Sequence, residues 1–84
     1  MIVFKELNTL AWNVHGVVNA KGRRRAKELV RMYRPSIFIL LETHWPFRVA
    51  ESFWQSMSYE VGELLEAQAH VGGIWILVEK NSQF

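Results

Sequence analysis

One carboxylate of the sequence stands directly after a continuous apolar run. Glu42 follows Ile-Phe-Ile-Leu-Leu at residues 37–41, so it is predicted to lie at the mouth of a largely dry strand. A carboxylate in such a place needs an arginine, backbone donors or a cation as its partner. Oxygen ligands of this kind suit Mg²⁺, which takes one or two protein carboxylates and keeps several waters. A structural glutamate that caps the next turn or pairs with an arginine fits the same pattern.

A second polar side chain, Asn13, interrupts an apolar segment between Trp12 and Val14. Its amide can both donate and accept hydrogen bonds, so it could orient a phosphate oxygen or an attacking group. The alternative is a turn residue that helps a strand to end before Gly16.

Several other chemistries are excluded by composition. The chain has no cysteine, so it has neither a disulfide nor a thiolate zinc site. All eight acidic residues are glutamate, so a Ser-His-Asp nucleophile system cannot form from these residues. The three histidines, His15, His44 and His70, lack zinc-ligand spacing and are typical of surface positions. No glycine-rich phosphate-binding motif is present.

Basic residues gather in one stretch of the sequence. Arg23, Arg24 and Arg25 are consecutive, with Lys21 and Lys27 on either side, and the formal net charge is +2. Such a cluster could attract phosphate and is a candidate contact for nucleic acid. A solvated helix face is the other interpretation.

Hydrophobic periodicity predicts how these residues are positioned. Alternation with a period of two indicates a strand over residues 6–14, and residues 19–22 are expected to form a loop. Ala26, Leu29, Val30 and Tyr33 form the apolar stripe of a helix over residues 23–34, which Pro35 ends. The apolar run at residues 37–41 indicates a central strand buried on both faces.

The second half of the chain is predicted to add three more elements. Pro46 can begin a helix that runs to about Met57. Gly72-Gly73 signals a turn or bulge. Strands are expected at residues 59–64 and, after the glycines, at residues 74–78.

A strand, an amphipathic helix and a buried strand in succession predict a βαβ unit with parallel strands. Asn13 then lies near the carboxyl end of the first strand and Glu42 just past that of the second. Open α/β sheets bind their ligands at this rim. We therefore expect Asn13 and Glu42 to lie at one edge of the sheet.

Three blocks of sequence resemble a known superfamily. The blocks are Leu-Ala-Trp-Asn-Val-His-Gly at residues 10–16, Arg-Pro-Ser-Ile-Phe-Ile-Leu-Leu-Glu-Thr at residues 34–43 and Val-Gly-Gly-Ile-Trp-Ile-Leu at residues 71–77. In this order they are similar to the first motifs of the endonuclease/exonuclease/phosphatase superfamily, which includes deoxyribonuclease-I-like enzymes. The third block resembles a strand of plant LINE-type retrotransposon endonuclease domains, which are associated with a reverse transcriptase.

The resemblance implies a role for each polar residue. Asn13 matches the active-site asparagine that helps to hold the phosphate, and Glu42 matches the glutamate that binds the divalent metal. The implied cofactor is Mg²⁺, and the implied reaction is hydrolysis of a phosphodiester bond, with nucleic acid as the expected partner.

The sequence also departs from the superfamily pattern. Ser36, Leu41 and His44 stand where Asp, Gln and Lys are usual. The later Asp-x-Asn and Ser-Asp-His motifs are missing, and so is the second sheet of the superfamily's four-layer α/β sandwich. Residues 1–84 are therefore expected to be the N-terminal part of such a domain, without the C-terminal catalytic half and inactive alone.

Two further expectations concern partners and location. A small nucleic-acid-binding or partner-dependent module without catalysis is the alternative function, and its strand at residues 74–78 is expected to be an exposed edge able to self-associate. No apolar run reaches the ~20 residues of a membrane span, and no signal-peptide core is visible. An intracellular chain, nuclear or cytoplasmic, is expected.

Overall fold

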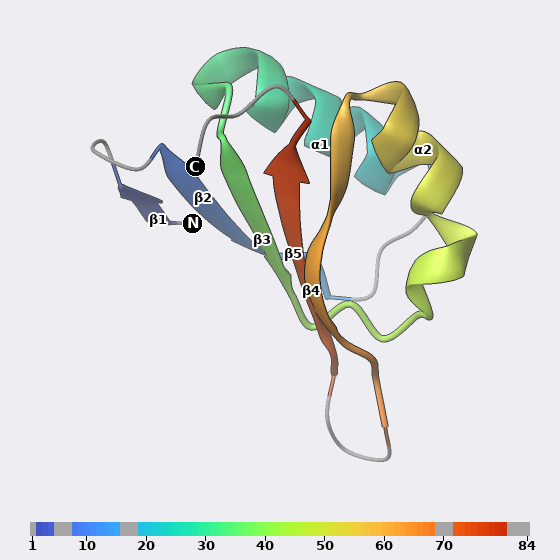
Figure 1. Ribbon diagram of the computed structural model, residues 1–84. Helices are drawn as coiled ribbons and strands as arrows, with labels where there is room; N and C mark the ends of the chain where they lie inside the picture. Colours follow the sequence, from blue (N-terminus) through green and yellow to red (C-terminus); the bar gives the residue numbers. More distant parts are fainter. Residues whose placement is uncertain (1, 5–7, 16–18, 69–71, 81–84) are drawn as a thin grey trace.

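The predicted strand-helix-strand unit forms at the start of the chain. In the computed structural model, which describes residues 2–4, 8–15, 19–68 and 72–80, β2 (Thr9–Asn13) pairs in parallel with β3 (Ile37–Leu41). The helix α1 (Ala20–Tyr33) connects them (Figure 1). The α/β fold class and the βαβ unit are therefore confirmed. Gly16 and residues 6–7 of the predicted first strand lie outside the described residues.

Local hydrogen bonds set the two ends of α1. The Asn19 side chain accepts a hydrogen bond from the backbone N–H of Gly22 at 3.1 Å, so the helix begins within the segment predicted to be a loop. At the other end, Arg34 adopts a left-handed conformation with φ 45° and donates its N–H to the carbonyl of Val30 at 2.7 Å. Pro35 follows and cannot continue the helix.

The sheet has five strands in the order β1-β2-β3-β5-β4. β1 (Ile2–Phe4), which the sequence pattern did not predict, pairs antiparallel with β2. β5 (Ile74–Glu79) lies between β3 and β4 (Tyr59–Leu65) and is antiparallel to both. The prediction that residues 74–78 form an exposed edge is therefore wrong, because β1 and β4 are the edge strands.

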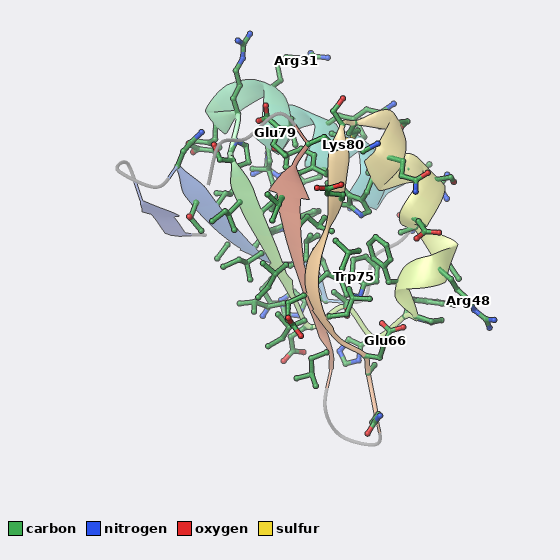
Figure 2. All side chains as sticks on the ribbon, in the orientation of Figure 1. Arg31, Arg48, Glu66, Trp75, Glu79 and Lys80 are labelled. Atoms are coloured by element: carbon green, nitrogen blue, oxygen red, sulfur yellow. The ribbon has the colours of Figure 1, made fainter. Side chains whose placement is uncertain are left out.

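The predicted helix at residues 46–57 is interrupted. A 3₁₀ helix η1 (Phe47–Val49) is followed by α2 (Glu51–Ser56), and Ala50 between them has φ −119° and ψ 0°. Both carboxylate oxygens of Glu66 accept the Phe47 N–H, at 3.1 and 3.2 Å, which ties η1 to the segment after β4. Figure 2 labels Glu66 near the lower end of β4, next to the helical segment that carries Arg48. The first N–H groups of a helix cannot bond within the helix, and the Glu66 carboxylate accepts one of them, the Phe47 N–H.

The core lies between the sheet and the helical layer. Phe38 and Leu40 of β3 and Trp75 and Leu77 of β5 are at most 2% exposed on this face. Aromatic rings meet edge to face, with centroids 5.5 Å apart for Phe38–Trp54 and 5.2 Å for Phe47–Trp75 (Figure 2 labels Trp75). Such pairs add about 0.5–1.5 kcal/mol beyond area burial.

The opposite face of the sheet is only partly covered. The helices lie on one side of the sheet (Figure 1), and the residues that alternate with the core residues are half-buried: Ile37, Ile39, Leu41, Ile74, Ile76 and Val78. The prediction that residues 37–41 are buried on both faces is therefore wrong for the described chain. The strand is central, but its second face has no layer against it among the described residues.

No helix among the described residues is long and apolar enough to cross a membrane.

Tyr59 connects the start of β4 to the end of α1. It is 2% exposed, and its hydroxyl donates a hydrogen bond to the carbonyl of Pro35. Burial raises the pKa of the Tyr59 hydroxyl far above its ordinary value, and the Glu79 carboxylate raises that pKa further. Both effects keep the hydroxyl protonated as a donor.

We predict that Tyr59→Phe lowers the free energy of unfolding by about 1–3 kcal/mol, because the buried Pro35 carbonyl loses its donor. The folded-state pKa of Tyr59 lies above the unfolded value of about 10, so this stabilisation is complete below pH ~10 and is lost as the pH rises through the folded-state pKa. Urea unfolding at pH 7 measures the loss caused by the substitution, and a series from pH 7 to 11 measures the beginning of the decline above pH ~10. The Tyr33→Phe variant is the control, and equal stability losses in the two variants would contradict the assignment.

Candidate functional site

Asn13 and Glu42 both lie at one rim of the sheet. Asn13 is paired in register with Leu41, and the Val14 N–H donates to the Leu41 carbonyl at 2.9 Å. The two parallel strands therefore end level with each other, and Glu42 follows directly. Asn13 and Glu42 both line one surface hollow of about 310 Å³, together with Leu41, Gly72, Gly73 and Ile74. The predicted juxtaposition of the two side chains is confirmed.

The asparagine and glutamate side chains are both accessible to solvent. Asn13 is exposed, and its Oδ1 accepts a hydrogen bond from the backbone N–H of His15 at 3.2 Å. This contact fits the predicted turn role, but it leaves the side-chain NH₂ donors of Asn13 outside that bond. The Glu42 side chain is 51% exposed. The sequence predicted that Glu42 lies at the end of a strand with little access to water. Its carboxylate instead lies beside the hollow and in contact with solvent.

A buried threonine anchors the segment that carries Glu42. Thr43 is fully buried and makes two hydrogen bonds to the glycine pair, from its N–H to the Gly73 carbonyl and from its hydroxyl to the Gly72 carbonyl, each 3.3 Å long. The His44 N–H also donates to the Gly72 carbonyl. These contacts fix the backbone on both sides of Thr43, and so they hold Glu42 and His44 at the rim.

The sequence pattern identified neither Thr43 nor the glycine pair as site residues. Gly73 has φ +92°, and a Cβ there would lie 2.4 Å from Thr43 Oγ1, so both conformation and space require glycine. The Gly-Gly dipeptide was the available signal, because adjacent glycines mark places where backbones approach closely. It predicted a turn but gave no hint that the partner was Thr43.

His44, predicted to be a surface residue, lies beside Glu42. Its Nε2 is 3.3 Å from Glu42 Oε2, and its side chain is 49% exposed. Glu42 and His44 both adopt positive φ, at 58° and 59°. Such backbone is uncommon outside glycine, asparagine and aspartate, and it turns the side chains on either side of Thr43 toward each other. His70 lies outside the described residues.

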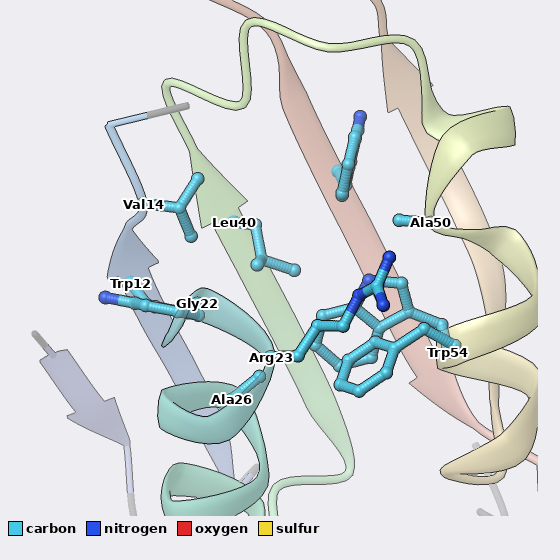
Figure 3. Close-up of a pocket in the computed structure, with 10 residues that line it drawn as sticks. Trp12, Val14, Gly22, Arg23, Ala26, Leu40, Ala50 and Trp54 are labelled. Atoms are coloured by element: carbon cyan, nitrogen blue, oxygen red, sulfur yellow. The ribbon is translucent and has the colours of Figure 1, made fainter. Parts of the chain in front are cut away.

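The arginine cluster does not join this site. Arg23, Arg24 and Arg25 are exposed on α1 but, as consecutive helical residues, they point about 100° apart and share no single face. Arg23 reaches toward Trp54 at a small cavity of about 30 Å³ between the helices and the sheet (Figure 3). Arg25 pairs with Glu28 at 3.1 Å. None of the three lines the hollow beside Glu42.

The rim offers a divalent cation one carboxylate, that of Glu42, among the residues that line the hollow. Within the described ranges, no three His, Cys, Asp or Glu side chains come close enough to hold one ion together. Mg²⁺ accepts one or two carboxylates and fills its other positions with water and phosphate. A half-exposed Glu42 beside an open hollow therefore fits Mg²⁺, provided that water completes most of the coordination shell.

In comparisons with known proteins, the chain matches no family model, no curated protein sequence and no solved structure. The superfamily resemblance therefore rests on the three sequence blocks alone.

We predict that Gly73→Ala destabilises the rim by at least about 1–2 kcal/mol, the cost of a left-handed conformation for a residue with a Cβ. The new methyl group also meets Thr43 Oγ1. Thermal unfolding of the variant measures the loss. The matched control is Gly72→Ala, where a Cβ comes no nearer than 3.0 Å to Glu42 Cα and the cost is smaller. Equal stability of the Gly73 variant and the wild type would refute the close packing of Gly73 on Thr43.

Proposed function

We propose that the rim formed by Asn13 and Glu42 binds a divalent cation and a phosphodiester group. The chain is then a relative of the endonuclease/exonuclease/phosphatase superfamily, whose members include nucleases. Within these 84 residues no aspartate is available to position or activate a water molecule. We therefore propose binding without turnover for this stretch alone.

The observation that best supports this proposal is the shared hollow. Two residues that are 29 positions apart in sequence line one surface depression because their strands are parallel neighbours in register. Depressions at the carboxyl ends of parallel strands are where open α/β sheets place ligands. A turn-capping role for either residue alone does not require this meeting.

Each side chain has a distinct part in the proposed binding. The Glu42 carboxylate holds Mg²⁺, and such a cation polarises a phosphoryl oxygen when it is bound. The Asn13 NH₂ group donates a hydrogen bond to a second phosphate oxygen, while its Oδ1 stays on the His15 N–H. The backbone hydrogen bonds of Thr43 keep the carboxylate at the rim.

We predict that Mg²⁺ shifts the backbone amide NMR signals around Glu42 and Asn13. Glu42→Gln is expected to weaken Mg²⁺ binding by about 10–100-fold. Loss of a residue that only supports a metal ligand already has an effect of this size, and Glu42 is the proposed ligand itself. Glu60→Gln, which removes an exposed carboxylate on the edge strand β4, leaves Mg²⁺ binding unchanged.

Two further measurements test the proposed contact of Asn13 with phosphate and the proposed absence of turnover. Asn13→Ala is expected to weaken binding of dimethyl phosphate in the presence of Mg²⁺. Abasic and plasmid DNA stay intact with the wild-type chain and Mg²⁺. Mg²⁺-induced NMR shifts that are identical in the wild type and in Glu42→Gln would refute the proposed cation site. DNA cleavage by the wild type that disappears in Glu42→Gln would refute the proposal that these residues do not turn over a substrate.

A second candidate function is supported by α1. Arg24, Lys27 and Arg31 are exposed and lie at i, i+3 and i+7, so they form a stripe of three basic residues along the helix, bordered by the carboxylate of Glu28. A stripe of this kind can follow a phosphate backbone. The proposal replaces the predicted trio of Arg23, Arg24 and Arg25, because only Arg24 of that trio belongs to the stripe.

We predict salt-dependent binding of single-stranded DNA to this stripe. Replacing both Arg24 and Arg31 by alanine lowers the slope of log affinity against log salt by about 0.7 per lost phosphate contact. Arg25→Ala is the matched control, since the Arg25 guanidinium is paired with Glu28. Fluorescence anisotropy at several salt concentrations measures the slopes. Equal slopes in the double variant and the wild type would remove this candidate.

A further inference from the structure

Glu42 and His44 present an oxygen and a nitrogen to the same small volume. Glu42 Oε2 and His44 Nε2 are 3.3 Å apart, and both side chains are about half exposed. At this distance the two side chains are hydrogen-bonded to each other. Two ligand atoms at about 2.1 Å from one ion lie about 3.0–3.4 Å apart at octahedral or tetrahedral angles. The hydrogen-bonded separation of 3.3 Å also lets both atoms reach one cation.

Backbone conformation and hydrogen bonds hold the Glu42 and His44 side chains close to each other. Thr43, between them, is fully buried and bonded to the glycine pair, while Glu42 and His44 both have positive φ. Gly72 provides the space for the imidazole, because a Cβ at Gly72 would lie 3.1 Å from His44 Cε1. The backbone around Glu42 and His44 is therefore positioned by contacts between two segments that are distant in sequence.

We infer that Glu42 and His44 form a two-residue chelate selective for borderline transition-metal ions, with Zn²⁺ as the test ion. The inference rests on the proposed function in taking Glu42 as a cation ligand, and it adds His44 as a second ligand. Imidazole suits Zn²⁺, whereas Mg²⁺ prefers oxygen ligands only. The rim then binds Zn²⁺ more tightly than Mg²⁺, with water or phosphate oxygens in the remaining positions.

Isothermal titration of the wild-type chain with ZnCl₂ and MgCl₂ tests the inference, and His44→Asn separates the two ions. Asparagine tolerates a positive φ, so this variant keeps the backbone conformation. We expect Zn²⁺ affinity to fall about tenfold or more, because the only nitrogen ligand is removed, while Mg²⁺ affinity stays within about twofold. His15→Asn is the matched control, because His15 does not join Glu42 and His44 in a group of three among the described residues.

The outcomes distinguish this inference from the proposed function. If Glu42→Gln removes binding of both ions and His44→Asn leaves Zn²⁺ affinity unchanged, the cation site stands and the chelate is refuted. If Glu42→Gln changes neither ion, the proposed function fails. A wild-type chain that binds Zn²⁺ no more tightly than Mg²⁺ also overturns the chelate.

A readout on the wild-type chain avoids any effect of substitution on folding. Mn²⁺ broadens NMR signals strongly only for groups near the ion. We expect the imidazole signals of His44 to broaden at lower Mn²⁺ concentration than those of His15. Equal broadening of both histidines contradicts a site at His44.

Discussion

The parallel register of β2 and β3 is the constraint on which the rest of the structure depends. Side chains alternate along a strand, so a slip of β2 by one residue would move Asn13 to the helix face and Trp12 to the opposite face. Leu10 and Phe38 are both fully buried against the helices, and their pairing selects this register over its neighbours. The same hydrophobic pairing that forms the core therefore places Asn13 level with Leu41 and beside Glu42.

A second constraint comes from the distant end of the chain. β5 enters between β3 and β4, and this insertion brings Gly72 and Gly73 against the residues that follow β3. Thr43 then turns inward to bond to both glycines, while the residues on either side of it turn outward. The exposed pair of Glu42 and His44 is thus a consequence of burying Thr43.

The sequence patterns predicted the features of the fold that depend on residues close together in the sequence. The stripe of Ala26 and Leu29 identified α1, and Pro35 marked its end, because helix periodicity and proline act over a few residues. β3 matches its predicted bounds for the same reason. The position of β5 was mispredicted as an edge, since an apolar run identifies a strand but carries no information about which neighbours flank it.

In the candidate site, too, some features were predictable from the sequence and others were not. Connection rules predicted the meeting of Asn13 and Glu42, because a βαβ crossover has one favoured hand and leaves its strands parallel. The approach of His44 to Glu42 could not be predicted, because it depends on two positive φ angles and on the space beside Gly72. Side-chain geometry of this kind is decided by long-range hydrogen bonds, which single-residue patterns do not record.

The partly covered face of the sheet bears on the cation binding that we propose for the rim. Asn13, Leu41 and Ile74 occupy paired register positions, so they lie on the same face as Ile39 and Ile76, away from the helices. The hollow is therefore continuous with an apolar surface of half-buried side chains. A layer placed on that surface would exclude water from one side of the hollow, and electrostatic interactions strengthen when water is excluded. The described residues supply no such layer, and the Glu42 side chain is 51% exposed, so the cation proposed for this rim would be held weakly in competition with bulk solvent.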